Sequence, residues 1–290
     1  MIRSVLWPKL GRRCVWALAL GCLVTGTPQL ARADETPFAA IYTTEVMPEG
    51  AAEVEQWLTW ASGKTQESFN SIEGRTEFEY GFSNRFLGAL YANYEWTRVV
   101  PHGPDAPDGL KDTTRFAGFS AEMIYQVLNP FTDAVGLALY AEPSIGANER
   151  ALEFKLLLQK NFLDDRLVLA MNANLEYVWV KNAGIWEDET ALEFFLGAAY
   201  RFAPGWYAGV EFLNENAYSG HIFAGAHAET NAFYLGPTLH YAAESWWATL
   251  GLEEQLPLAG NPGGDPAEIT HGYLTGAERF RLRLRIGVAL

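Results

Sequence analysis

The sequence predicts an all-β protein, a closed antiparallel up-and-down transmembrane β-barrel of about twelve strands. Apolar and polar residues alternate along most of the chain from residue 53 onward, which is the pattern of strands with two different faces. Most alternating segments have about 9–13 residues, which is long enough for a tilted strand to cross a bilayer. Short and long connections follow one another in turn, as they do at the two ends of a membrane barrel.

Residues 1–33 have the features of a cleaved signal peptide. A basic stretch precedes the short apolar run Cys14–Val24, and the small residues of Ala31–Ala33 fit a cleavage site. We expect residues 34–52 to form an N-terminal segment in the periplasm and residues 53–290 to form the barrel. Both cysteines of the chain lie within the signal peptide, so the mature chain has no thiol for a disulfide.

Twelve segments carry the alternation. The last is the clearest, because Phe280, Leu282 and Leu284 alternate with Arg281 and Arg283. The same pattern predicts strands over residues 53–61, 75–83, 86–97, 115–127, 135–143, 150–160, 167–180, 189–201, 206–214, 230–241, 246–254 and 279–290.

The connections predict which end of the barrel faces which compartment. Short turns are expected at 83–85, 128–134, 161–166, 202–205 and 242–245. Long loops are expected at 62–74, 98–114, 181–188, 215–229 and 255–278, with 144–149 as a brief exception. An even number of strands puts both termini at the short-turn end, which we expect in the periplasm.

Aromatic residues collect at the ends of the predicted strands. Those beside the short turns are Phe82, Phe86, Phe162, Tyr200, Phe202, Trp206, Tyr241 and Trp246, and those near the long loops are Trp60, Tyr94, Trp96, Tyr177 and Trp179. Two aromatic bands around an aliphatic belt suit the two interfaces of a bilayer. A soluble β-sandwich would show the same alternation with its apolar face inward. The loop asymmetry and the aromatic bands favour the membrane barrel.

The charge of the chain excludes a nucleic-acid binder. The net charge is −14, from 21 basic and 35 acidic residues, and residues 1–33 hold five of the basic residues and no acid. The mature chain is therefore still more acidic, whereas nucleic-acid binding requires a basic surface.

Charged side chains on the inward face are the candidate functional residues. The inward acids are Glu53, Glu55, Glu77, Glu79, Glu95, Glu122, Glu142, Glu153, Glu176, Glu193, Glu211 and Glu253; the inward bases are Arg75, Lys155, Arg279, Arg281, Arg283 and Arg285. Closure of the barrel would set the ladder of four arginines, residues 279–285, against Glu53 and Glu55 and beside Glu253. The ladder then either neutralises buried carboxylates along the closing seam or forms a charged constriction that selects solutes.

The start of the mature chain resembles a family of uncharacterised proteobacterial outer-membrane proteins. The resemblance rests on Tyr42–Gly50, with its Thr-Thr and Pro-x-Gly, on Glu53–Trp57, with its Glu-x-Glu, and on Arg75–Gly81 in the second strand. It covers about residues 40–95 and implies a barrel with a transporter-like role and no established substrate. The last strand also resembles the assembly signal of outer-membrane barrels, although it ends in Leu290 where Phe or Trp is usual.

These features predict a narrow passive channel in the cell outer membrane for small hydrophilic solutes. A barrel without conductance, structural or ligand-binding, is the first alternative, and a lipid-modifying enzyme is the second. The enzyme is disfavoured because Ser219-Gly220-His221 is the sole close Ser/His pair and lies in a loop. We therefore expect no enzyme activity, no cofactor and no metal site. The expected partners are outer-membrane lipid, the barrel-assembly machinery and a small hydrophilic solute.

Overall fold

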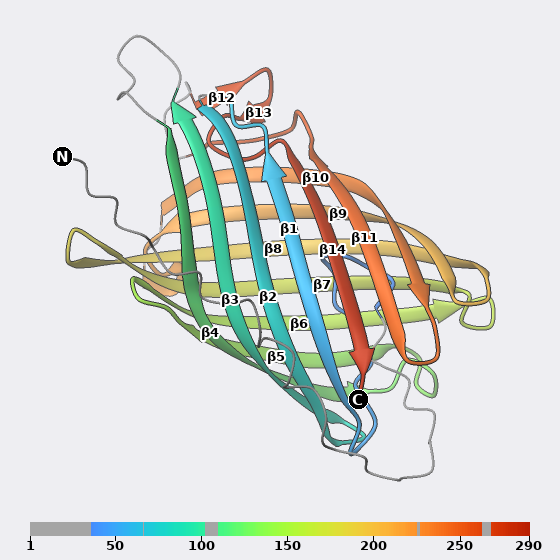
Figure 1. Ribbon diagram of the computed structural model, residues 1–290. Coiled ribbons are helices and arrows are strands. Elements are labelled where there is room, and N and C mark those ends of the chain that lie inside the picture. Colours follow the sequence, from blue (N-terminus) through green and yellow to red (C-terminus); the bar gives the residue numbers. More distant parts are fainter. Residues whose placement is uncertain (1–35, 66, 102–109, 225–226, 263–267) are drawn as a thin grey trace, which may run out of the picture. The chain divides into compact units, whose positions relative to one another are not determined.

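A computed structural model describes residues 36–65, 67–101, 110–224, 227–262 and 268–290. The predicted signal peptide, residues 1–33, lies outside these residues. Twelve strands form a closed barrel (Figure 1). They are β1 (Ala52–Ser62), β2 (Glu67–Ser83), β3 (Phe86–Pro101), β4 (Lys111–Leu128), β5 (Gly136–Ile145), β6 (Glu149–Phe162), β7 (Leu167–Asn182), β8 (Ile185–Ala203), β9 (Trp206–Ser219), β10 (His227–Ala242), β11 (Trp246–Gln255) and β14 (Phe280–Ala289).

Each barrel strand pairs with its two neighbours in antiparallel fashion, and β14 closes the ring by pairing with β1 and β11. The predicted fold class and strand number are confirmed. A small hairpin of β12 (Ile269–Thr270) and β13 (Tyr273–Leu274) lies in the connection between β11 and β14, and the 3-10 helix η1 (Ile222–Ala224) follows β9. None of the helices among the described residues has the length and hydropathy that crossing a membrane requires.

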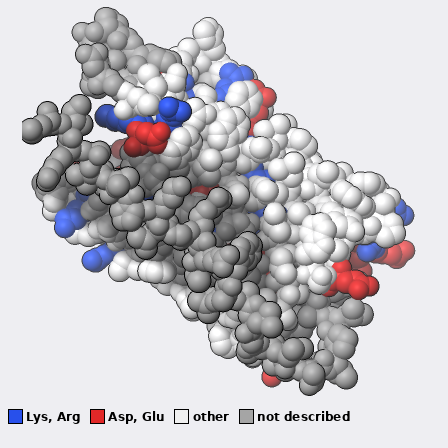
Figure 2. Space-filling model, viewed as in Figure 1, with Lys and Arg blue, Asp and Glu red and all other residues white. Residues whose placement is uncertain are grey.

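The strict alternation of the sequence becomes two different barrel surfaces. Alternate side chains such as Leu90, Leu139 and Leu250 point outward and are 65%, 51% and 44% exposed, whereas their chain neighbours face the interior. On the face drawn in Figure 2, most charged atoms gather towards the two ends and leave an uncharged surface between them. This apolar exterior fits the hydrocarbon layer of a membrane.

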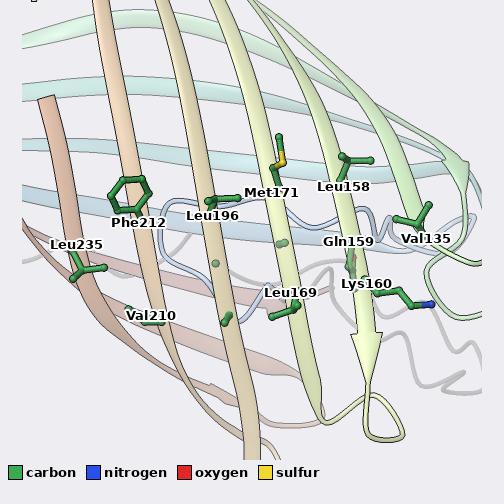
Figure 3. A pocket seen from close by; sticks show the side chains of 13 residues that line it. Val135, Leu158, Gln159, Lys160, Leu169, Met171, Leu196, Val210, Phe212 and Leu235 are labelled. Carbon is green, nitrogen blue, oxygen red and sulfur yellow. The ribbon is translucent and has the colours of Figure 1, made fainter. Parts of the chain in front are cut away.

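A shallow apolar groove runs over the outside of β6–β10. Leu158, Leu169, Met171, Leu196 and Phe212 from neighbouring strands line it (Figure 3). The groove lies on the apolar exterior, so lipid acyl chains would fill it in a bilayer, and it is not part of the lumen.

The two ends of the barrel differ, but less than the sequence predicted, because the expected loops 62–74 and 181–188 are short turns. At one end the strands are joined by short turns, for example Pro204–Gly205 between β8 and β9, and we call this the short-turn end. The opposite end carries the connections around 102–110, 220–226 and 256–279, and we call it the long-loop end.

Some expected long loops are shorter, because the strands continue beyond the apolar alternation. Hydrogen-bonded pairing between β7 and β8 continues to Asn182 and Ile185, so the expected loop 181–188 is a tight turn at Ala183 and Gly184. Both turn residues have positive φ angles, 49° and 89°, as a two-residue type I′ hairpin requires. Polar residues outside the bilayer can stay in a strand as long as their backbone groups remain paired.

Aromatic side chains form a continuous group at the short-turn end. The ring of Trp206 contacts Phe202 and Tyr241, and Tyr241 contacts Trp246, with centroid separations of 4.6–6.5 Å. Phe202, Trp206 and Trp246 are also exposed. Amphipathic rings at one level around a barrel are typical of a membrane interface.

Because Leu250 points outward, a charge at this position should lower the stability of the folded barrel in lipid. Leu250 lies midway along β11, and Leu250→Arg is expected to destabilise the folded barrel in lipid by about 2–4 kcal/mol, the cost of an arginine near the bilayer midplane. Leu258→Arg, at an exposed position between β11 and β12, serves as the control and should change stability little. Urea titration in vesicles measures both; equal effects would contradict the assignment.

Candidate functional site in the barrel lumen

The chain that precedes β1 runs inside the barrel. Residues 36–51, which we call the plug, include Phe38, Ile41 and Thr44, each 0% exposed, and Met47, 1% exposed. The sequence analysis expected residues 34–52 to form an N-terminal segment in the periplasm. In the structure, residues 36–47 of this segment lie in the lumen, and Pro48, Glu49 and Gly50 are exposed. The physical reason is that the apolar side chains of the plug find apolar partners on the inner wall.

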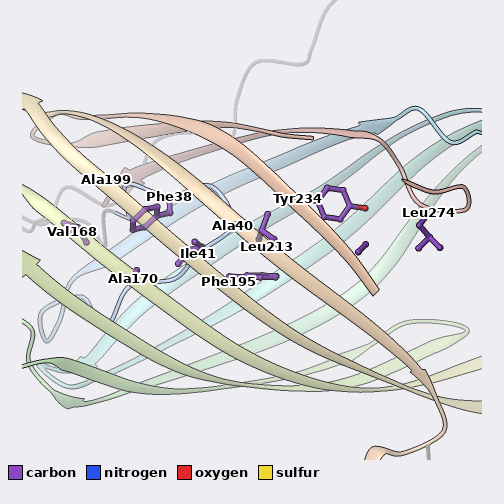
Figure 4. Packing of buried hydrophobic residues seen from close by; sticks show 11 residues of the cluster. Phe38, Ala40, Ile41, Val168, Ala170, Phe195, Ala199, Leu213, Tyr234 and Leu274 are labelled. Carbon is purple, nitrogen blue, oxygen red and sulfur yellow. The ribbon is translucent and has the colours of Figure 1, made fainter. Parts of the chain in front are cut away.

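Two apolar clusters hold the plug. In the first, Phe38 and Ile41 pack with Val168, Phe195 and Leu213 on β7, β8 and β9 (Figure 4). The second surrounds Met47 with buried side chains of β3–β6, namely Leu87, Ile124, Ala138, Tyr140 and Leu157. Burial of side chains this large contributes about 1.5–3 kcal/mol each, so the plug belongs to the core of the folded chain.

One carboxylate binds the backbone near the start of the plug. Glu211 on β9 is 0% exposed, and its Oε1 accepts hydrogen bonds from the amides of Ala40 and Ile41 at 2.8 and 3.0 Å, while Oε2 accepts from Ala39 at 3.2 Å. A backbone that is not paired in a sheet needs such partners, because buried unpaired amides are costly. Glu211 therefore acts as an anchor for the plug.

Amide side chains of the wall bind the next part of the plug. Asn172 makes two hydrogen bonds to the backbone of Tyr42, accepting from its N–H at 2.8 Å and donating to its carbonyl at 2.9 Å. Gln159 accepts from the Thr44 amide at 2.9 Å, and Gln126 donates to the Thr44 carbonyl at 2.7 Å. In this way the wall replaces the β-ladder partners that the plug lacks.

The predicted arginine ladder points into the barrel, but its register differs from the expectation. Arg285 lies opposite Trp57 and Arg283 opposite Thr59, whereas Glu53 and Glu55 lie opposite Ala289 and Gly287. The Nη2 atom of Arg285 still reaches Glu55 along a diagonal at 3.2 Å.

Two of the four arginines contact the plug directly. Arg285 donates to the carbonyl of Phe38 at 3.4 Å and lies 3.6 Å from the centroid of the Trp57 ring. Arg283 donates to the carbonyl of Ala39 at 3.4 Å and to Thr59 Oγ1 at 3.0 Å. These two arginines therefore bind the plug, and the sequence analysis did not predict this contact.

The other two arginines lie nearer the long-loop end. Arg281 forms a bidentate pair with Glu215, contacts Glu278 at 2.9 Å and lies 3.8 Å from Glu253. Arg279 is more exposed and pairs with Glu254 at 2.9 Å. Of the predicted seam pairs, the structure therefore brings together Arg285 with Glu55 and Arg281 with Glu253.

Four of the predicted site residues, Glu53, Glu55, Glu77 and Glu79, form a group of carboxylates at the short-turn end. Glu53 pairs with Glu79, and Glu55 with Glu77, as direct neighbours across β1 and β2. All four are at most 5% exposed. Trp247 donates to Glu53 at 2.6 Å, and Trp57 donates to Glu55 at 2.6 Å. This group is called the acidic cluster below.

On the long-loop side of the plug the lumen opens into a polar cavity of about 400 Å³. Its charged lining side chains are of both signs, and Trp57 adds an aromatic surface. They are Arg75, Arg115, Arg283, Glu73, Glu95 and Glu149. Such a cavity suits small hydrophilic molecules, since it offers donors and acceptors of both charges.

The sequence analysis missed the plug, although a signal for it exists. Several strands carry apolar residues on the inward face, including Leu87, Ile124, Leu157 and Val168 near the short-turn end and Leu213 midway along β9. A water-filled lumen does not favour inward apolar side chains. Their concentration at one end indicates that something apolar covers them.

Comparisons with known proteins agree with this architecture. Residues 30–290 match a family described as "Family of unknown function (DUF6662)", and the chain belongs to that family. No curated protein matches the sequence.

Among solved structures, the chain is similar to the COG4313 outer-membrane channel from Pseudomonas putida F1, with 13% identity and a TM-score of 0.59 over 85% of this chain and 98% of that one. It is also similar to the NanC porin, with 9% identity and a TM-score of 0.52 over 83% of this chain and 100% of that one. At these identities the likeness shows a shared outer-membrane barrel fold.

Proposed function

We propose that this member of a family of unknown function is a narrow outer-membrane channel for small hydrophilic solutes, and that the plug controls passage through it. One observation carries the proposal: a polar cavity with both signs of charge lies directly against a plug that covers the short-turn half of the lumen. The short-turn end then faces the periplasm and the long-loop end faces the exterior, and the apolar belt contacts outer-membrane lipid.

The chemistry of the plug contacts supports a plug that can move. Apart from Glu211, its backbone is bound mainly by neutral amides, and its two arginine contacts are long, at 3.4 Å. Each hydrogen bond of this kind contributes only about 0.5–1.5 kcal/mol net. Displacement of the plug would join the cavity to the periplasmic opening without a change in the barrel wall.

A barrel without conductance is the second candidate, and the burial of the plug favours it. Phe38, Ile41 and Met47 fill apolar clusters as core residues do. In that case the cavity of about 400 Å³ binds a ligand from the outside and nothing passes through.

Conductance in a planar bilayer separates the two candidates. We expect the intact mature chain to show brief openings of small conductance, with a reversal potential in a salt gradient that indicates cation preference, because the inward glutamates predicted from the sequence outnumber the predicted inward bases by twelve to six. Lower salt should strengthen the preference, since screening decreases. Heat-denatured protein is the control. Folded protein that never conducts would contradict the channel, and anion preference would contradict the charge argument.

A further inference from the structure

The acidic cluster is not explained by channel function, and its geometry is unusual for carboxylates in a lumen. Side-chain oxygens of Glu55, Glu77 and Glu79 all lie within 4.8 Å of one another. Two ligands of one Ca²⁺ ion, each at 2.3–2.6 Å from it, are at most about 5 Å apart. The three carboxylates therefore already have the spacing of cation ligands.

A second observation is that buried oxygens of the cluster lack donors. Among the described residues, no hydrogen-bond donor reaches Oε2 of Glu53, Glu77 or Glu79, and each of these atoms is buried. Glu53 is itself 0% exposed, and its carboxyl group is in contact with that of Glu55. A buried carboxylate oxygen without a donor is costly unless a cation or a proton neutralises it.

The basic residues nearby do not balance the cluster. Among the described residues, Arg285 forms a salt bridge with Glu55 at 3.2 Å, while Glu53, Glu77 and Glu79 form none. Arg75, two residues before Glu77 on β2, also acts on Glu77 by its charge, but it is shared with Glu142 at 4.0 Å. Four carboxylates therefore face two guanidinium groups, one of which also serves Glu142. Like charges this close disfavour joint ionisation without a counter-ion.

We propose that Glu55, Glu77 and Glu79, with Glu53 beside them, form a divalent cation site for Ca²⁺ at the short-turn end of the barrel. Hard oxygen ligands and a flexible carboxylate set suit Ca²⁺, which accepts six to eight oxygens. The ion would join β1 to β2 beside the seam, and it would neutralise the charges that Arg285 leaves unpaired. The sequence analysis expected no metal site. Glutamates at alternate positions of two strands have no recognisable ligand spacing, so the sequence does not reveal this group.

The test uses the full mature chain, refolded in detergent and stripped of metal with a chelator. Equilibrium dialysis with radioactive Ca²⁺ should show one ion bound per chain, and saturating Ca²⁺ should raise the thermal unfolding midpoint. The variant Glu77→Gln/Glu79→Gln should lose both effects. The matched control, Glu176→Gln/Glu193→Gln, removes two other inward carboxylates on adjacent strands and should keep both. Wild-type protein that binds no Ca²⁺, or a cluster variant that binds as wild type does, would overturn the site.

Tb³⁺ gives a measurement that does not depend on whether the cluster variants fold. Because the Trp57 indole contacts Glu55 at 2.6 Å, Tb³⁺ in the site should emit on tryptophan excitation, and Ca²⁺ should displace it. Trp57→Phe should lower this emission while Ca²⁺ binding by dialysis is retained. Trp247, which donates to Glu53 at 2.6 Å, can excite the same ion. Emission that Ca²⁺ does not displace, or that is unchanged in the double variant Trp57→Phe/Trp247→Phe, would place the ion elsewhere and overturn the proposal.

Discussion

Deletion of residues 38–47 is expected to convert rare, brief openings into a sustained open pore. The deleted segment contains the apolar anchors Phe38, Ile41 and Met47 and the backbone groups that Glu211 and Asn172 bind. Loss of the three anchors also removes about 1.5–3 kcal/mol of burial each, so a lower unfolding temperature should accompany the higher conductance. Single-channel recording and thermal unfolding of the same preparation measure the two effects.

A point substitution tests the same idea in an intact chain. A Cβ atom on Gly251, on the inner face of β11, would lie 2.4 Å from the Cβ atom of Ala39. A Cβ atom cannot rotate away, so Gly251→Leu should force the plug backbone from its place and raise conductance. Ala248→Leu adds bulk to the outer face of the same strand and should leave conductance unchanged. A folded Gly251→Leu barrel with wild-type conductance would show that the plug does not control passage.

Arg281→Leu is expected to destabilise the barrel by about 3–5 kcal/mol, because it leaves buried carboxylates without their partner. Arg281 is 15% exposed and lies between Glu215, Glu253 and Glu278. Arg279→Leu removes the same charge two residues earlier on the same face, but its pair with Glu254 is far more exposed, so it should cost only about 0–1 kcal/mol. Urea titration in vesicles compares the two variants.

A second substitution identifies the cause of the loss. Glu253 is 2% exposed, and the variant Arg281→Leu/Glu253→Gln removes its charge together with that of the arginine. The double variant should be more stable than the sum of the two single effects predicts, since contacting residues are coupled. Strict additivity would mean that Arg281 is not coupled to Glu253, and that it contributes through Glu215, Glu278 or packing against the Tyr234 ring at 4.0 Å.

The barrel was predictable from the sequence because alternation at period two is local information. Each strand shows which side chains share a face, and the short turns show where strands end. Alternation does not fix register, since a shift by two residues keeps every side chain on its face. The register of β14 against β1 therefore differs from the prediction. Glu53 lies opposite Ala289, and Arg285 lies opposite Trp57.

The plug was not predictable in the same way, because it has no regular secondary structure of its own. Its apolar residues, Phe38, Ile41 and Met47, are irregularly spaced, as their positions follow the shape of the inner wall. Its polar partners, Asn172 and Gln159, are neutral and therefore did not stand out among the inward charges. Only the inward apolar residues on several strands, considered together, point to a segment inside.

The path of the plug also determines how it could leave the lumen and return to it. The Thr36 carbonyl accepts from Thr249, near the start of β11, and the Gly50 amide donates to Gly81, near the end of β2, so the plug begins and ends close to the same rim. Among the described residues, a segment whose two ends lie at one rim can withdraw through the opening at that rim. The seam between β1 and β14 need not separate. If the plug moves as proposed, a finished barrel could lose and regain it without any change in the pairing of its strands.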